Sequence, residues 1–236
     1  MPDETLNETY WLIGLHIPAD LLPVSLMWAG NVLMLALVIL AIKKFSFTEL
    51  LNNKPSQNVL FGAMVALLLI WKIKAGISPG LGFHHLGATM FTLMFGWPLA
   101  LLGLSTIMLA SVLLQHNEVL SLGINGLLSV AIPVFVSYGI LRLSQKRLPD
   151  NFFIYIFVAA FFGAGIAVAA SRLSAIALLS LVQAYPDSQL VTESLVYVPL
   201  FMFPEAFVTG MLTSAMVIYK PEWVMTFDDE RYITGK

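Results

Sequence analysis

An apolar run of 32 residues, from Asn151 to Val182, constrains the fold of this chain more than any other feature. As a helix it would measure ~48 Å, more than the roughly 30 Å hydrocarbon layer of a bilayer. Its only charged residue, Arg172, lies about two thirds along it and marks the expected far interface. The whole chain is 58% hydrophobic and 11% charged, whereas soluble globular proteins carry about 25% charged residues. The sequence therefore indicates a membrane-embedded protein.

Further apolar runs predict an all-α, polytopic membrane protein of about seven transmembrane helices. The other six predicted spans cover residues 24–42, 58–71, 86–95, 99–114, 123–141 and 195–219. Gly96-Trp97-Pro98 separates two short runs and favours a tight turn or a sharp kink between them. We expect a single integral membrane domain over residues 1–236, made of an external segment (1–23), a helical bundle (24–219) and a cytoplasmic tail (220–236).

Lysine and arginine in the loops predict the orientation. With seven spans and the N-terminus outside, the outside loops hold only Lys72 and Lys74. The inside loops then hold Lys43, Lys44, Lys54, Arg142, Lys146, Arg147, Lys220, Arg231 and Lys236. The reverse orientation inverts this bias, so we expect the C-terminus inside. All four histidines, His16, His84, His85 and His116, then lie at the external face.

Several function classes lack support in the sequence. A net charge of −2 gives no indication of a nucleic-acid partner, and the absence of cysteine excludes disulfides and thiolate metal sites. No Gly-x-x-x-x-Gly-Lys loop is present, so an ATP-driven step needs separate subunits. No His-Glu-x-x-His motif is present either, and we expect no enzyme activity.

The stretch Ser78-Pro79-Gly80-Leu81-Gly82-Phe83-His84-His85-Leu86-Gly87 is the candidate site, because it holds two of the four histidines between two apolar runs. Histidine is a common ligand for transition metals. Adjacent histidines diverge by about 100° on a helix, but an irregular, glycine-containing turn lets both face one ion. The alternative is that they cap a helix or lie as amphipathic side chains in the headgroup layer.

Four segments occur in one order along the chain: Leu15-His16-Ile17-Pro18-Ala19-Asp20-Leu21-Leu22, then Pro79 to Gly87, then Leu122-Gly123-Ile124-Asn125, and finally Gly210-Met211-Leu212-Thr213-Ser214-Ala215. Together they resemble segments of the substrate-capture components of cobalt and nickel energy-coupling factor transporters, the CbiM type. The family patterns are Met-His-Ile-Pro-x-Gly-Phe-Leu, Pro-Gly-Thr-Ser-x-His-Leu-Leu-Gly, Leu-Gly-Ala-Asn and Glu-Gly-x-x-Thr-Ala.

The resemblance implies a metal site near the outer face. Its ligands are the free amino end of the chain, the backbone nitrogen and side chain of the histidine at the second position, and the histidine of the Pro-Gly segment. These histidines correspond to His16 and His84, and the planar nitrogen set suits Ni(II), or in a related form Co(II). Here Leu15 replaces the methionine and 14 residues precede it, so no free amine adjoins His16. His85 and His116 are additional donors, and a site rebuilt from imidazoles and a carboxylate would also suit Zn, Cu or Fe.

Four further residues are candidates for supporting the metal ligands: Asp20, Asn125, Glu205 and Thr209. Thr209 stands where the family has glutamate, and Glu205 lies one helical turn earlier on the same face. An ionisable residue inside a span is a functional candidate. The alternative for Glu205 is a position near the outer surface, in water or paired with Arg172.

The resemblance implies capture and uptake of a transition-metal ion, with the chain as the substrate-specific permease subunit of an energy-coupling factor transporter. Its implied setting is the bacterial inner membrane, with separate ATPase and coupling subunits as partners. The alternative function is a non-transporting accessory or metal-sensing membrane protein that keeps the same fold.

Overall fold

The computed structural model describes residues 17–73, 78–114 and 119–234. Within these residues, five helical segments are long and apolar enough to cross a membrane: Val24–Lys44, Ala88–Leu114, Val119–Arg147, Phe152–Leu181 and Asp187–Tyr219. A sixth apolar helix, Lys54–Ile70, is shorter. The protein is thus an all-α membrane protein with five to six long apolar helices, whereas the apolar runs predict about seven spans.

The individual elements follow the chain in a simple order. They are α2 (Val24–Lys44), α3 (Phe47–Leu51), α4 (Lys54–Ile70), α5 (Ala88–Leu114), α6 (Leu122–Gly126), α7 (Ile132–Arg147), α8 (Phe152–Ile154), α9 (Gly163–Leu181), α10 (Asp187–Glu193) and α11 (Val198–Tyr219). Wider helical turns at Leu127–Ala131 and Tyr155–Phe162 join α6 to α7 and α8 to α9. A short turn, η1, covers Ala19–Leu21.

Two boundaries differ from the sequence-based prediction for local reasons. Helix α4 begins before residue 58, because the Asn53 side chain accepts a hydrogen bond from the Ser56 amide (3.1 Å) and Pro55 suits the first turn. Helix α10 lies between the predicted spans 151–182 and 195–219, where no helix was predicted.

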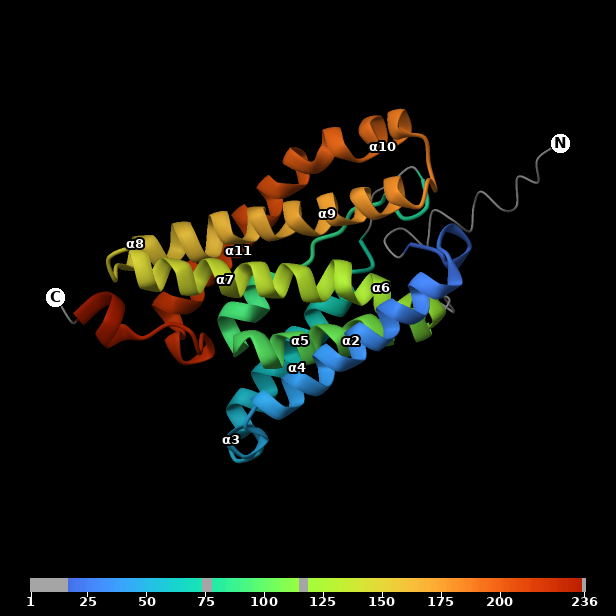
Figure 1. Cartoon of the computed structure of the whole chain (residues 1–236). Coiled ribbons are helices and arrows are strands. Elements are labelled where there is room, and N and C mark those ends of the chain that lie inside the picture. The colour runs from blue at the N-terminus through green and yellow to red at the C-terminus, as the bar shows by residue number, and fades with distance from the viewer. Residues whose placement is uncertain (1–16, 74–77, 115–118, 235–236) are drawn as a thin grey trace.

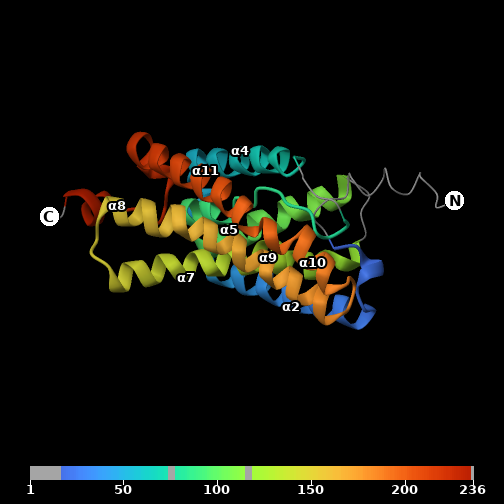
Figure 2. The same cartoon turned by 90° about the horizontal axis from the view of Figure 1, so that it is seen from above.

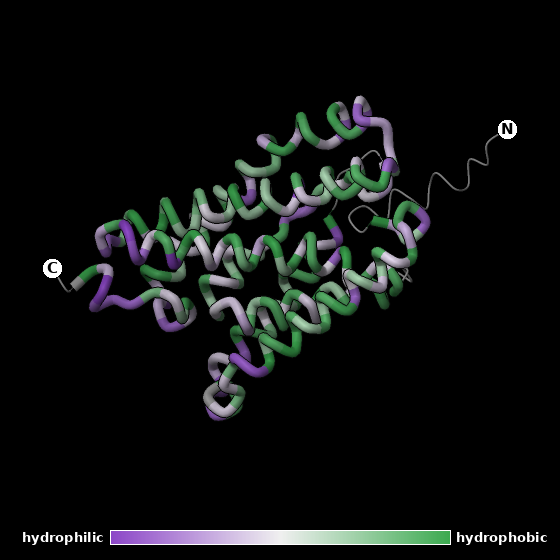
Figure 3. The backbone as a smooth tube through the Cα atoms, viewed as in Figure 1, coloured by the Kyte–Doolittle hydropathy of each residue, from purple (hydrophilic) through white to green (hydrophobic). Residues whose placement is uncertain are grey.

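The helices form an elongated bundle in which α9 lies between α7 and α11 (Figures 1 and 2). Helix α5 packs against α2, α4 and α7 and has the most buried residues of any element. The outward faces remain apolar: Trp28 and Val32 on α2 are 60% and 66% exposed. Hydrophobic residues, green in Figure 3, predominate along the helices, and hydrophilic residues, purple, lie mostly near helix ends and in connections. Such a surface is suited to lipid, because large apolar patches are rare on soluble monomers.

Helix α5 reverses direction at Gly96. This residue has φ 72° and ψ 162°, a conformation that favours glycine, and Pro98 follows it closely. A Cβ atom on Gly103 would lie 3.5 Å from the ring of Phe91, whereas residues twelve apart on a straight helix are ~18 Å apart. The predicted break at Gly96-Trp97-Pro98 is thus present, and residues on its two sides pack together.

Positive charge is concentrated at the end of the bundle that carries the C-terminus (Figure 1). Lys43 and Lys44 end α2, Lys54 begins α4, and Lys146 and Arg147 end α7. The N-terminal end of the described chain and the loop before α5 lie toward the other end (Figure 1).

The C-terminal tail packs on the bundle. The Met225 amide donates to the Met94 carbonyl (2.9 Å), and the Thr226 amide and hydroxyl donate to the Leu93 carbonyl (3.3 and 2.8 Å). These carbonyls lie just before Gly96, where the helical ladder stops and backbone acceptors lack helical partners. The tail therefore caps the first half of α5.

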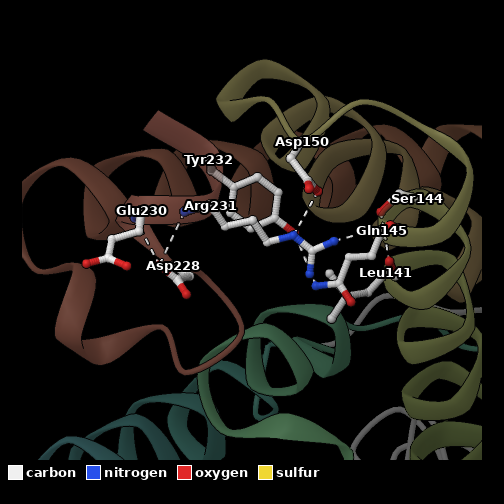
Figure 4. A network of polar contacts seen from close by, with 8 residues as sticks. All are labelled: Leu141, Ser144, Gln145, Asp150, Asp228, Glu230, Arg231 and Tyr232. Carbon is white, nitrogen blue, oxygen red and sulfur yellow. Dashed lines mark hydrogen bonds and ion pairs between the residues drawn. The ribbon is translucent and has the colours of Figure 1, made fainter. Parts of the chain in front are cut away.

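A polar network binds the tail at Arg231 and Tyr232 to the segment from α7 to α8 (Figure 4). Arg231 donates to an Asp150 carboxylate oxygen (2.8 Å) and to the Gln145 carbonyl (3.2 Å). The hydrogen bond with Asp150 raises the pKa of Arg231 above its ordinary value, so this arginine stays charged. The Gln145 amide in turn donates to the Tyr232 hydroxyl (3.1 Å).

We expect removal of residues 225–236 to destabilise the folded protein by at least about 2 kcal/mol, since three hydrogen bonds to buried carbonyls are lost. Thermal unfolding in detergent measures the effect. Arg231→Ala is the control, because a partly exposed ion pair contributes less than about 1 kcal/mol. Equal melting temperatures for the truncated and full-length proteins would show that the tail does not cap α5.

Candidate metal-binding site

The candidate site is the irregular loop Ser78–Gly87, which precedes α5 and is mostly buried. The loop has no regular hydrogen-bonding ladder of its own, so its conformation depends on partners from other elements.

The first part of the loop is bound to the α10 region. The Ser78 hydroxyl donates to the Glu193 carboxylate and accepts from the Gln189 side-chain amide (3.1 Å). The Tyr185 hydroxyl donates to the Pro79 carbonyl (3.0 Å). These contacts join segments that are more than a hundred residues apart in the sequence.

Arg172 of α9 holds the middle of the loop. Its Nη1 donates to the Gly82 carbonyl (2.9 Å), and its guanidinium lies 5.2 Å from the centre of the Phe83 ring. Phe83 stacks on Phe201 of α11 at 3.9 Å. Arg172 is only 4% exposed. Arg172 is therefore buried inside the protein, where the loop carbonyl and the aromatic ring stabilise its charge.

Glu205 of α11 holds the end of the loop. Its Oε2 accepts from the Leu86 amide (2.8 Å) and its Oε1 accepts from the Gly87 amide (2.7 Å). His85 Nδ1 lies 2.9 Å from the same Oε2. Glu205 is 3% exposed, and Arg172 is an electrostatic partner of its carboxylate. Glu205 thus lies inside the bundle rather than in water, and two backbone amides, the His85 ring and the charge of Arg172 stabilise its carboxylate.

The two histidines of the loop contact different residues: His85 lies beside Glu205, and His84 lies beside Trp71. The His84 ring packs against Trp71 at 4.7 Å, and the Trp71 indole donates to the Leu86 carbonyl (3.3 Å). His84, His85 and Glu205 all line one cavity of about 420 Å³. Its other walls are apolar: Ile70, Ile73, Phe83, Phe201, Pro204 and Val208.

Asn125 of α6 binds Ile17, the residue that follows His16. Its Oδ1 accepts from the Ile17 amide (2.8 Å), and its Nδ2 donates to the Ile17 carbonyl (3.1 Å). Ile17 in turn touches the loop, since a Cβ atom on Gly80 would lie 3.3 Å from the Ile17 Cα. The residue after His16 is therefore held beside the loop that carries His84.

Two of the remaining candidate residues, Asp20 and Thr209, lie outside the lining of the cavity beside the two loop histidines. His16 and His116 lie outside the described residues. Asp20 is exposed on η1, away from the cavity lining. Thr209 is fully buried one turn beyond Glu205, and its hydroxyl has no hydrogen-bond partner within the described part of the chain. Among the described residues, no three His, Asp or Glu side chains already converge as a metal site.

The fold has counterparts among solved structures. A "Truncated Transition metal Transporter" superposes with a TM-score of 0.74 at 20% identity and covers 87% of this chain and 99% of that one. A second "transition metal transporter" superposes with a TM-score of 0.71 at 20% identity, over 86% and 92% of the two chains. At this identity the likeness shows a shared fold.

A family profile described as "Cobalt uptake substrate-specific transmembrane region" matches residues 16–223. The chain belongs to the CbiM family. The "Cobalt transport protein CbiM" of Acetohalobium arabaticum is 29% identical over 143 residues, which are 59% of this chain. The matched region spans 56% of that relative's length. The family resemblance read from the sequence segments is thus confirmed.

Several residues that shape the loop carry no sequence signal that singles them out. Trp71, Tyr185 and Gln189 belong to ordinary apolar or polar stretches, and their contacts depend on tertiary structure. Arg172 and Glu205 did have a signal, because each is an ionisable residue within an apolar run. Pairing of the two was one alternative for Glu205, and the structure shows that both bind the loop Ser78–Gly87.

We expect Gly87→Ala to destabilise the protein by about 1–3 kcal/mol. Gly87 has φ +66°, and an added Cβ would lie 2.7 Å from Leu67 Cδ1. Gly62→Ala is the matched control, since nothing lies within 4 Å of its Cβ position. Thermal unfolding of both variants measures the difference, and an unchanged Gly87→Ala protein would contradict a rigid loop.

Proposed function

We propose that this protein is the substrate-specific transmembrane component that captures a divalent transition-metal ion for uptake. The observation that carries the proposal is the buried loop of His84 and His85, held in place by Glu205 and Arg172. Imidazole nitrogens bind Ni, Co, Zn, Cu and Fe. A loop whose backbone is already fixed presents them without a further ordering cost.

Cobalt and nickel are the proposed substrates. The family description names cobalt uptake, and the relative from Acetohalobium arabaticum is named a cobalt transport protein. His16 and His84 are the primary proposed ligands, with His85 and His116 as additional donors and Asn125, Glu205, Thr209 and Asp20 as supporting residues. The contacts from Asn125 to Ile17 support a position of His16 near the loop.

We further propose separate ATPase and coupling transmembrane subunits as partners, in a bacterial inner membrane. The sequence has no Gly-x-x-x-x-Gly-Lys loop of its own. The proposed topology has seven crossings, with the two parts of α5 counted separately, the histidine loop outside and the C-terminus inside. The reversal at Gly96 and the basic residues at one end support it.

The topology can be tested by cysteine labelling, because the natural sequence contains no cysteine. Lys43 and Ser188 are both exposed. We expect Ser188→Cys to react with a membrane-impermeant maleimide on intact spheroplasts, and Lys43→Cys to react only after the membrane is opened. Labelling of both positions from the same side would contradict the proposed topology.

Metal binding can be tested through the N-terminal segment. A variant that lacks residues 1–14 and carries Leu15→Met starts Met-His and places a free amine beside His16. We expect it to bind Ni²⁺ at least about tenfold more tightly than the full chain, a difference of ~1.4 kcal/mol. Isothermal titration calorimetry on the two purified proteins measures this difference.

The control is His16→Ala in the shortened chain, which should remove the gain. Equal tight binding by both forms would show that the amine does not contribute. If neither form binds Ni²⁺ or Co²⁺, the proposed function fails and the accessory role becomes the better explanation of the fold.

A further inference from the structure

We propose that His85 is itself a metal ligand, through Nε2, for a hydrated divalent transition-metal ion in the cavity beside α11, and that Glu205 is its positioning residue. The inference rests on the proposed function, since it requires that the protein captures such an ion. It gives His85, proposed above as an additional donor, a specific ligand atom, a positioning residue and an entry cavity.

The contact between His85 and Glu205 determines which ring nitrogen is available. Nδ1 lies 2.9 Å from Oε2 of the carboxylate. Two lone pairs at this distance would repel, so Nδ1 carries a hydrogen, and Nε2 is the ring nitrogen that can offer a lone pair to a metal ion. The contact with Glu205 uses Nδ1 and does not involve Nε2. An imidazole of this kind can accept a metal ion without breaking this contact.

Glu205 is held firmly enough to orient the ring. Both of its oxygens accept backbone amides of the same loop, from Leu86 and Gly87. The carboxylate is therefore bound to the residues directly after His85, and the loop and the ring share one anchor. A metal-binding histidine usually donates its second ring nitrogen to such a carboxylate, which fixes the ring and raises the basicity of the ligand.

The cavity supplies the space. It measures about 420 Å³, and His84, His85 and Glu205 are the ionisable residues in its lining. The His85 side chain is 18% exposed and that of Glu205 is 4% exposed, so the imidazole faces the opening while the carboxylate lies behind it. The apolar walls offer no competing oxygen ligand from side chains. Water completes the coordination of an ion that enters here.

The test compares two substitutions at His85 in the full-length protein. His85→Asn keeps a side-chain N–H near the Nδ1 position but has no counterpart of Nε2. His85→Ala lacks both groups. If Nε2 binds the ion, both variants lose at least about tenfold in Co²⁺ affinity by calorimetry. If His85 merely supports the loop, His85→Asn binds Co²⁺ like the natural protein, and the inference is overturned.

The visible absorption of bound Co²⁺ gives a readout that loop stability alone would not change. Loss of a nitrogen ligand should shift the ligand-field bands in His85→Asn, measured at saturating Co²⁺. Identical band positions in the natural protein and the variant would overturn the inference. His85→Asn and His85→Ala both leave Glu205, Leu86 and Gly87 unchanged. Gel filtration and thermal unfolding verify that the two variants fold.

The role of Glu205 is tested by Glu205→Gln and Glu205→Asp. We expect Glu205→Gln to weaken Co²⁺ binding by about 10- to 100-fold, because an amide can turn its NH₂ toward the ring and no longer selects the tautomer. Glu205→Asp should recover part of the affinity. Full affinity in Glu205→Gln would contradict a positioning role.

The outcomes for the two proposals are distinct. A natural protein that binds Co²⁺ tightly, together with unaltered binding by His85→Asn, overturns this inference and leaves the proposed function standing. A natural protein that binds neither Co²⁺ nor Ni²⁺ overturns the proposed function and this inference with it.

Discussion

A buried carboxylate on α11 is the interaction on which the Ser78–Gly87 end of the bundle depends. Burying a charge in an apolar bundle is unfavourable unless the charge is paired and hydrogen-bonded. Glu205 meets this condition through two backbone amides, the His85 ring and the nearby Arg172 guanidinium. The same contacts fix the backbone of the loop Ser78–Gly87, here called the histidine loop. The desolvation penalty of the carboxylate is thus offset by interactions that also place two imidazoles.

The loop is connected to the opposite end of the bundle through the first half of α5. The Gly87 carbonyl accepts the Phe91 amide at the start of this helix (3.0 Å). At the other end of the half-helix, Met225 and Thr226 donate to the Met94 and Leu93 carbonyls. A short half-helix that could not be stable alone in water is therefore held at both ends by segments distant in sequence. The histidine loop and the C-terminal tail belong to one continuous set of contacts.

Part of this arrangement could be predicted from the sequence. The long apolar runs gave the helices, the Gly96-Trp97-Pro98 triplet gave the break in α5, and four short segments gave the family. Arg172 and Glu205 were conspicuous as charges in apolar runs. The loop partners were not predictable, because a contact such as that from Tyr185 to Pro79 depends on tertiary packing across the bundle. The packed tail was unpredicted too, since its bonds go to backbone carbonyls, which carry no sequence pattern.

The central claim is that a preformed histidine loop, held by a buried carboxylate, binds a transition-metal ion through imidazole nitrogen. X-ray absorption at the metal edge of the Ni²⁺- or Co²⁺-loaded full-length protein tests this claim most directly. The account predicts nitrogen ligands at ~2.0–2.1 Å with the multiple scattering that imidazole rings produce, from at least two histidines. A spectrum with oxygen ligands alone and no imidazole scattering would contradict it.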